Sequence, residues 1–253
     1  MELFFRKVIA QDGVGYTLFG DKPISLTGYF DPIPTENWQR TRGNTIVKLG
    51  WETWKRCYSQ SAIRNYLFFE EPSDIDPALK IVTLVNKRAF IDTVNAHREI
   101  FEQILGGKVT GQELLAKLEN HETGLFDLLQ YHEGLYGILL GYGKKNAFLF
   151  QRRMDLNIYN PHPKFLLSSG ICRKEYDSLE EEISFLKDDL QVVAQNDLLS
   201  PIDLPIFLGI RKSEESIALI NQYHVIRKQL NHIFYQKEFL KRVFEQLMAE
   251  NQK

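Results

Sequence analysis

The feature that most constrains the fold is a C-terminal segment, from Ser213 to about Ala249, that contains neither glycine nor proline. Apolar residues recur in it every seven positions, and a second series fills the alternate positions of the same seam. The first series is Leu219, Ile226, Ile233, Leu240 and Leu247, and the second is Tyr223, Leu230, Lys237 and Phe244. This spacing predicts one long helix with an apolar stripe. The stripe can meet the chain's own core or another chain, and the sequence leaves both open.

The composition is that of an ordinary folded chain. With 253 residues, 43% of them apolar, the chain can bury a core that needs no metal or disulfide. The net charge of −2 argues against a dedicated nucleic-acid binder, because such proteins carry a basic excess. Cys57 and Cys172 form no close pair and no zinc pattern, so two free thiols are favoured over one long-range disulfide.

The sequence contains no membrane-spanning or targeting signal of a familiar kind. No run approaches the roughly 18 apolar residues that a transmembrane helix needs. The opening residues, Met1–Lys7, are charged at the wrong places for a signal peptide. We therefore expect a soluble, cytoplasmic protein, or an exported one if an upstream leader has been removed.

Expected strands lie mainly in the first third of the chain, and expected helices in the rest. The strands are Tyr16–Gly20, Pro23–Phe30, Asn65–Phe69, Lys80–Val85 and, much later, Leu204–Ile210. The pattern predicts an α+β fold, with a small β-rich N-terminal sheet covered by helices and a long C-terminal helix. We expect one domain over residues 1–253, with a possible subdivision into 1–87 and 88–253.

Helical spacing and capping residues mark the other helices. Two apolar faces are predicted, one formed by Val47, Trp51, Trp54 and Tyr58 and the other by Phe90, Val94, His97, Phe101 and Ile104. Thr110 and Ser178 each begin a capping box. A helix pair is predicted at about Leu125–Leu140 and Lys145–Met154, with a turn between its helices at Gly141–Gly143.

Three stretches carry a resemblance to other proteins. Tyr16–Pro23, Gly141–Phe150 and Leu204–Gly209 resemble segments of uncharacterised predicted proteins from chlamydia-like and related intracellular bacteria. The resemblance covers much of the chain and implies no activity, cofactor or site residue. Some such proteins begin with an exported leader, so the resemblance slightly favours an envelope or host-facing role.

No familiar catalytic or metal-binding motif is complete. The phosphate loop, the dinucleotide fingerprint and the nucleophile elbow are all absent. His121-Glu122 and His132-Glu133 start like a zinc-protease motif, but neither has the second histidine that the metal requires. We therefore expect no metal and no cofactor.

The best candidate for anion binding is the turn formed by Gly141, Gly143, Lys144, Lys145 and Asn146. Its glycines allow backbone N–H groups to converge at a helix N-terminus, where phosphates bind, and two lysines stand beside them. The alternative is a structural turn, because the same lysines follow the preceding helix, where positive charge is favourable.

His97 is the weak catalytic candidate, because it lies within an apolar face and its charge is tunable near neutral pH. A buried structural histidine is the alternative. Cys57, beside Lys55 and Arg56, is a second candidate on the ground that nearby cations lower a thiol pKa. No partner base or nucleophile can be assigned to either residue.

A basic segment that carries all three tryptophans is the candidate for partner binding. From Trp38 to Arg64 six basic residues stand against Glu52 alone. Such a patch can dock an acidic protein, a lipid headgroup or RNA, unless the tryptophans are core residues and the charges a solvated face. The expected contact residues are Trp38, Arg40, Arg42, Lys55 and Arg56.

These observations favour an interaction protein without catalytic activity, which uses the basic segment, the C-terminal helix or both. The alternative is an enzyme of unfamiliar type that acts on an anionic or phosphorylated small molecule. A deep cleft that joins His97 to the lysine-bearing turn would favour the enzyme. A third possibility is a self-assembling protein that uses the C-terminal helix.

Overall fold

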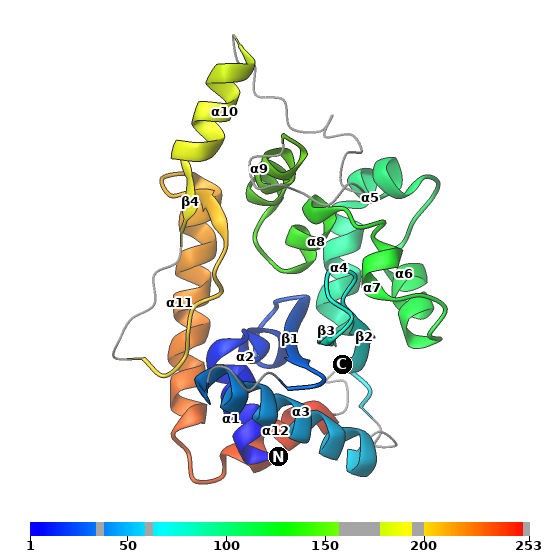
Figure 1. Ribbon diagram of the computed structural model, residues 1–253, viewed down its shortest axis with the longest axis vertical. Helices are drawn as coiled ribbons and strands as arrows, with labels where there is room; N and C mark the ends of the chain where they lie inside the picture. The colour runs from blue at the N-terminus through cyan, green and yellow to red at the C-terminus, as the bar shows by residue number, and fades with distance from the viewer. Residues whose placement is uncertain (34–37, 59–62, 157–177, 194–199, 250–253) are drawn as a thin grey trace. The chain divides into compact units, whose positions relative to one another are not determined.

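The computed structural model describes residues 1–33, 38–58, 63–156, 178–193 and 200–249 (Figure 1). The chain divides into two compact units. The first unit comprises Met1–Phe90, Asn196–Leu204 and Val225–Lys253, and the second comprises Ile91–Gln195 and Pro205–His224. The C-terminal segment therefore returns to the unit that contains the N-terminus. None of the helices in the described ranges is both long enough and apolar enough to span a bilayer.

The first unit is built on a three-stranded antiparallel sheet. Its strands are β1 (Ile24–Phe30), β2 (Tyr66–Pro72) and β3 (Leu79–Asn86), in the order β1-β3-β2. Ile24 pairs with Val85, and Phe69 pairs with Thr83. The three N-terminal strands expected at Pro23–Phe30, Asn65–Phe69 and Lys80–Val85 are confirmed, and the α+β class with them.

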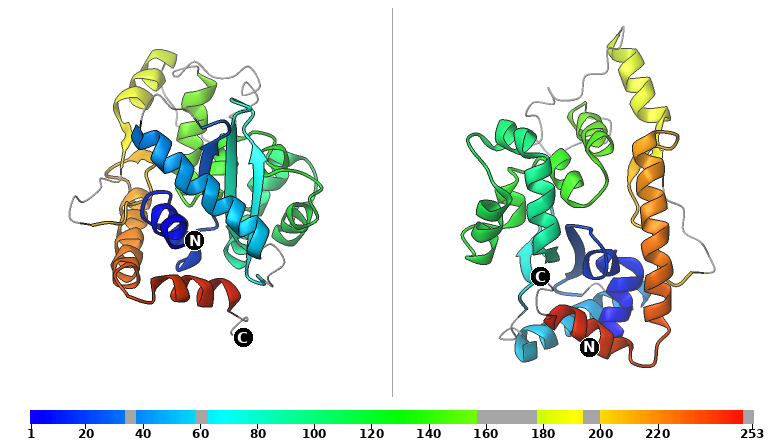
Figure 2. Two further views of the ribbon diagram at one scale, coloured as in Figure 1. Left: turned by 60° about the horizontal axis from the view of Figure 1, so that its bottom comes forward. Right: turned by 180° about the vertical axis from the view of Figure 1, so that it is seen from behind.

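Helices α1 (Glu2–Gln11), α3 (Trp38–Tyr58) and α12 (Phe239–Met248) surround an aromatic core. Figure 2 shows α3 lying across the strands. The Trp54 ring packs against Phe5, Phe68 and Phe244, with ring centroids 6.0, 5.3 and 6.3 Å away. Trp51 and Trp54 are each only 3% exposed, so the predicted apolar face of α3 is a core face.

The strand expected at Tyr16–Gly20 is wrong. These residues belong mostly to a short helix, α2 (Val14–Leu18), that begins after Gly13 in a left-handed conformation with φ of 72°. Every residue of α2 is buried, and the Tyr16 hydroxyl donates to the Asp203 carbonyl at 3.1 Å. A short run that is buried on all sides lacks the alternation that separates a strand from a helix.

The long C-terminal helix is present as α11 (Glu214–Phe234), but it ends before the predicted limit at Ala249. A turn at residues 235–238 separates it from α12. The Arg6 guanidinium donates to the Phe234 carbonyl at 2.7 Å and lies over the Phe234 and Phe239 rings. No glycine or proline in this segment predicts a break between α11 and α12. The contacts of Arg6 from α1 lie at this break, and the local sequence does not reveal them.

Several residues of the apolar stripe lie in the chain's own core. Leu230 contacts Gly15 so closely that an added Cβ would stand 3.0 Å from a leucine methyl group. Ile226 lies in the same way against Gly20, and Leu247 is fully buried. The stripe therefore packs within the first unit at these positions, which answers the question that the heptad spacing left open.

The second unit is mainly helical. Its helices after α4 (Lys87–Ala96), which begins in the first unit, are α5 (Arg98–Leu105), α6 (Gly111–Glu119), α7 (Leu125–Leu128), α8 (Glu133–Leu139), α9 (Lys144–Asp155) and α10 (Leu179–Asp188). Strands β4 (Leu190–Val192) and β5 (Leu208–Ile210) form a two-stranded antiparallel sheet. The strand expected at Leu204–Ile210 is therefore shorter than predicted.

Two predicted helices of this unit are each broken in two. The helix expected through Phe90 and Ile104 breaks at His97, which becomes the N-cap of α5. The helix expected at Leu125–Leu140 breaks at residues 129–132, where Gln130 and Tyr131 have positive φ values of 52° and 57°. Left-handed conformations cost a non-glycine residue about 1–2 kcal/mol each, so propensity alone would not select this break.

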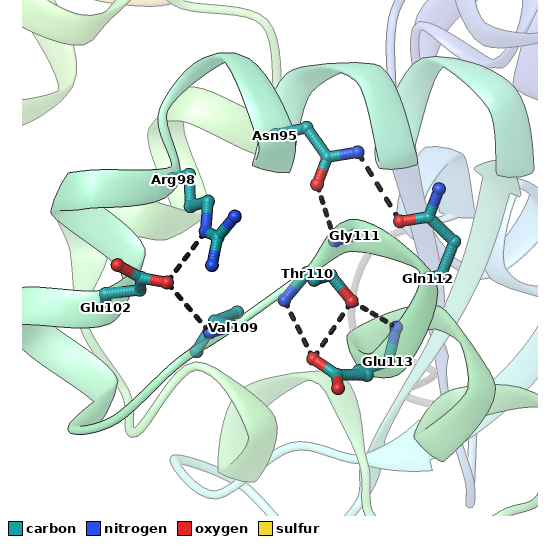
Figure 3. Close-up of polar contacts among 8 residues, drawn as sticks. All are labelled: Asn95, Arg98, Glu102, Val109, Thr110, Gly111, Gln112 and Glu113. Atoms are coloured by element: carbon teal, nitrogen blue, oxygen red, sulfur yellow. Dashed lines mark hydrogen bonds and ion pairs between the residues drawn. The ribbon is translucent and has the colours of Figure 1, made fainter.

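Both predicted helix caps are confirmed. The Thr110 hydroxyl accepts from the Glu113 N–H at 3.2 Å, and the Glu113 carboxylate accepts from the Thr110 N–H at 3.0 Å (Figure 3). The Ser178 hydroxyl accepts from the Glu181 N–H at 3.1 Å in the same way. These motifs were predictable because all of their partners lie within three residues of each other.

Lys22 is a charged residue buried in the first unit, with only 6% of its surface exposed. Its ammonium group donates to the Ile24 carbonyl at 2.7 Å and to the Ser25 hydroxyl at 3.2 Å. Burial lowers the pKa of Lys22 from 10.5 to about 7, because the charged form loses its hydration.

We predict that Lys22 makes the stability of the first unit rise with pH between about 7 and 10.5. In this window the unfolded chain binds a proton at Lys22 that the folded chain does not bind. The free energy of unfolding should therefore rise by up to about 1.4 kcal/mol per pH unit, and this rise should disappear in Lys22→Met. Urea unfolding of both proteins at pH 7, 8 and 9 measures it, and parallel pH profiles would contradict it.

Candidate functional site

The lysine-bearing turn is held by a carboxylate of the chain itself. The Glu215 side chain, from the start of α11, accepts from the Lys145 N–H at 3.1 Å and from the Asn146 N–H at 3.0 Å. Gly143 has φ of 85°, and a Cβ there would stand 2.6 Å from the Glu215 carboxyl carbon. The N-terminus of α9 therefore holds an anion, as such termini favour, and the anion is Glu215.

Buried hydrogen bonds fix the rest of this turn. Asn146 is only 1% exposed; its amide donates to the Tyr142 carbonyl at 3.0 Å and accepts from the Ser216 hydroxyl at 3.2 Å. The Tyr223 hydroxyl donates to the Gly141 carbonyl at 2.6 Å. The side chains of Lys144 and Lys145 remain exposed. Binding of an external anion at this turn stays a prediction, because Glu215 already uses two of its backbone donors.

An apolar pocket lies beside the turn, with a volume of about 230 Å³. Residues of α8, of α9 and of the turn between them form part of its wall, and the β4–β5 sheet with the segment before β5 forms the rest. Its lining residues are Glu133, Gly137, Leu140, Tyr142, Asn146, Ala147, Phe150, Val192, Ile206, Phe207 and Leu208. The Tyr142 ring stacks on Phe207 with centroids 5.5 Å apart. Val192 and Ile206 are themselves exposed, so the lining includes apolar surface that reaches solvent.

Glu133 is the one acid among the lining residues. It is the first residue of α8, and its side chain is half-buried. Burial raises the pKa of Glu133 above its usual range, because the carboxylate loses hydration in apolar surroundings. Burial also raises the pKa of Tyr142 to about 12, so its phenol stays neutral. A perturbed carboxyl in a largely apolar pocket is typical of a binding or catalytic site.

His132 caps the helix that begins with Glu133, and the sequence pattern does not reveal this role. Its ring nitrogen Nδ1 accepts from the Leu135 N–H at 3.3 Å, so His132 caps α8 directly before Glu133. The His132 ring is buried, and its centroid lies 5.6 Å from that of the Phe148 ring. Burial lowers the pKa of His132. The sequence indicates His132-Glu133 only as an incomplete zinc motif. The one hint that His132 caps a helix is its position directly before the apolar run of α8.

His97 lies near the turn but does not line the pocket. Burial lowers the pKa of His97, the Lys144 charge lowers it further, and the Glu215 charge opposes both. The structure thus brings His97, Lys144 and Glu215 into one electrostatic neighbourhood. Within the described residues no side chain forms a hydrogen bond to His97 that would orient it as a base. Its catalytic role stays a prediction.

The basic segment in the first unit presents exposed charge, and two of its three tryptophans are core residues. Arg42, Lys55 and Arg56 are exposed, and Lys55 forms an ion pair with Glu70 at 3.4 Å. The side chains of Trp38 and Arg40 lie outside the described residues, as does Cys172, while Cys57 is exposed and free. Partner binding by this segment stays a prediction, and Trp51 and Trp54 are core residues.

No protein-family model, curated protein or solved structure matches this chain. In the part of the chain that the structure describes, no group of three or more histidine, cysteine, aspartate or glutamate side chains is placed to hold a metal ion. The function is therefore argued from the pocket and its polar residues.

We predict that Glu215→Ala destabilises the N-terminus of α9, whereas Glu214→Ala does not. Loss of the Glu215 carboxylate leaves two N–H groups without their acceptor, at a cost of about 1–2 kcal/mol. Glu214 is its exposed neighbour and serves as the matched control. Hydrogen exchange at the Lys145 and Asn146 amides should accelerate at least tenfold in Glu215→Ala only. Equal exchange in the two variants would show that Glu215 is no cap.

Proposed function

We propose that this chain is a binding protein without catalytic activity of its own, and that it takes a small, mainly apolar organic molecule into the pocket of the second unit. The observation that carries the proposal is the pocket itself, which combines an apolar lining with one half-buried carboxyl. Pockets of this kind are the usual location of small-molecule sites.

The size of the pocket limits the ligand. Its volume of about 230 Å³ lies below the range of roughly 300–1,000 Å³ that drug-sized ligands occupy. A single aromatic ring or a short branched chain fits this volume better than a nucleotide or a sugar chain. Burial of about 150 Å² of apolar ligand surface contributes about 4 kcal/mol, which corresponds to roughly millimolar affinity for a bare probe.

The arrangement around the turn supports binding over catalysis. The enzyme alternative requires a cleft that joins the turn to His97, yet the pocket includes Tyr142 and Asn146 but not His97. The Asn146 amide, moreover, is already engaged by Tyr142 and Ser216. The exposed residues Arg42, Lys55 and Arg56 remain a separate candidate surface for an acidic partner.

We predict that a neutral single-ring probe, 2-phenylethanol, binds saturably at this pocket and that Ile206→Ser weakens its binding about three- to tenfold. Ile206 lines the pocket but is 56% exposed, so its replacement removes ligand contact without opening the core. Ile217→Ser is the matched control, because Ile217 is 48% exposed and does not line the pocket. Titration by two-dimensional NMR measures both affinities.

Chemical-shift changes should centre on residues such as Leu140, Tyr142 and Phe207. Changes spread over both units without saturation, or an equal loss of affinity in the two serine variants, would contradict a pocket for apolar molecules.

A further inference from the structure

The polar groups of the pocket differ in how much of their hydrogen-bonding capacity is already used. The Asn146 amide donates to Tyr142 and accepts from Ser216, so it is satisfied within the fold. The Tyr142 phenol is neutral and its ring stacks on Phe207. Glu133 is the remaining polar side chain of the lining, and it is the one that can carry a charge. Recognition of a ligand's polar end therefore depends mainly on Glu133.

The Glu133 carboxyl has no cationic partner within the part of the chain that the structure describes. Among the described residues, no lysine, arginine or histidine forms an ion pair with it, and burial is the cause of its raised pKa. Arg152 follows the lining residue Phe150 by two positions in α9, and its guanidinium forms an ion pair with Glu182 at 2.7 Å. A carboxylate in apolar surroundings gains more from an added cation than an exposed one does, because water screens the pair less.

The charge of Glu133 also decides which ligands the pocket disfavours. A carboxylate or phosphate ligand would place a second negative charge beside Glu133, which is unfavourable in apolar surroundings. The lysines of the turn, Lys144 and Lys145, do not line the pocket and have exposed side chains, so solvent screens their charge. A neutral ligand would fill the apolar space but leave the carboxylate without a counter-ion. An ammonium group satisfies both the charge and the acceptor oxygens.

We propose that the natural occupant of this pocket is a small organic amine, in which an aromatic or branched aliphatic group fills the apolar space and an ammonium group pairs with the Glu133 carboxylate. This inference rests on the proposed function and names the chemical class of its ligand. His132 holds α8 in the capped geometry that places Glu133 at its first position.

The test compares two probes of nearly equal shape, 2-phenylethylamine and 2-phenylethanol, on the full chain at pH 7. The amine should bind at least tenfold more tightly than the alcohol, because the ammonium gains an ion pair in a desolvated site. In Glu133→Gln, which keeps the size and polarity of the side chain, amine affinity should fall at least tenfold. Alcohol affinity should fall less than amine affinity, because the hydroxyl carries no charge and can donate a hydrogen bond to either side chain. Unchanged NMR shifts away from the pocket would report that the variant is folded.

A second experiment uses the unaltered protein, so that it does not depend on whether Glu133→Gln folds. NMR titration of the Glu133 side-chain carboxyl should show that its pKa falls when the amine binds, since the ammonium stabilises the carboxylate. By linkage, amine affinity should rise with pH through the pKa of Glu133, whereas alcohol affinity should change much less.

The outcomes separate this inference from the proposed function. Equal affinities for the two probes, with no effect of Glu133→Gln and no change in the Glu133 pKa, would overturn the amine as ligand and leave the apolar pocket standing. Failure of both probes to bind would overturn the pocket as a binding site and the amine with it. Preferential binding of the amine that depends on Glu133 would support both.

Discussion

The contact between the Glu215 carboxylate and the first N–H groups of α9 is the interaction on which the second unit's candidate site depends. It joins two segments about 70 residues apart in the sequence and fixes the turn that ends at Asn146. That turn carries Tyr142, whose ring stacks on Phe207 and so connects α9 to the segment before β5. Tyr142 and Asn146 of this turn both line the pocket, so the contact holds residues of its wall.

An internal carboxylate also changes how the lysine-bearing turn is understood. The glycines, the helix N-terminus and the lysines together describe a place that attracts an anion, and this physical expectation is sound. Glu215 meets it from within the chain, and Gly143 is needed because a Cβ there would clash with that carboxylate. The side chains of Lys144 and Lys145 are exposed. Our proposal for ligand binding therefore rests on Glu133 in the neighbouring pocket and not on the turn.

Prediction from sequence succeeded where the controlling contacts are local. The Thr110 capping box, the buried face of α3 and the three strands of the sheet follow from spacings of two to four residues. It failed where a distant contact overrides propensity. At the stop of α11 the Phe234 carbonyl accepts from the distant Arg6, and Tyr16 lies in a helix whose residues are all buried. Of the candidate site, Tyr142 and Asn146 lay within the predicted turn, whereas Glu133 was passed over because its motif looked incomplete.

The fold class, the positions of most helices and the apolar stripe of the C-terminal segment can be read from the sequence alone. Hydrophobic periodicity predicts them, because the face on which a side chain lies follows from its position within its own helix or strand. Tertiary packing, in contrast, is what places buried positions of the stripe, such as Leu230, against Gly15 in the chain's own core. It also decided that Glu133 stands alone as an acid in an apolar pocket. Desolvation and the absence of a counter-ion arise from residues far apart in the chain, and no local pattern records them.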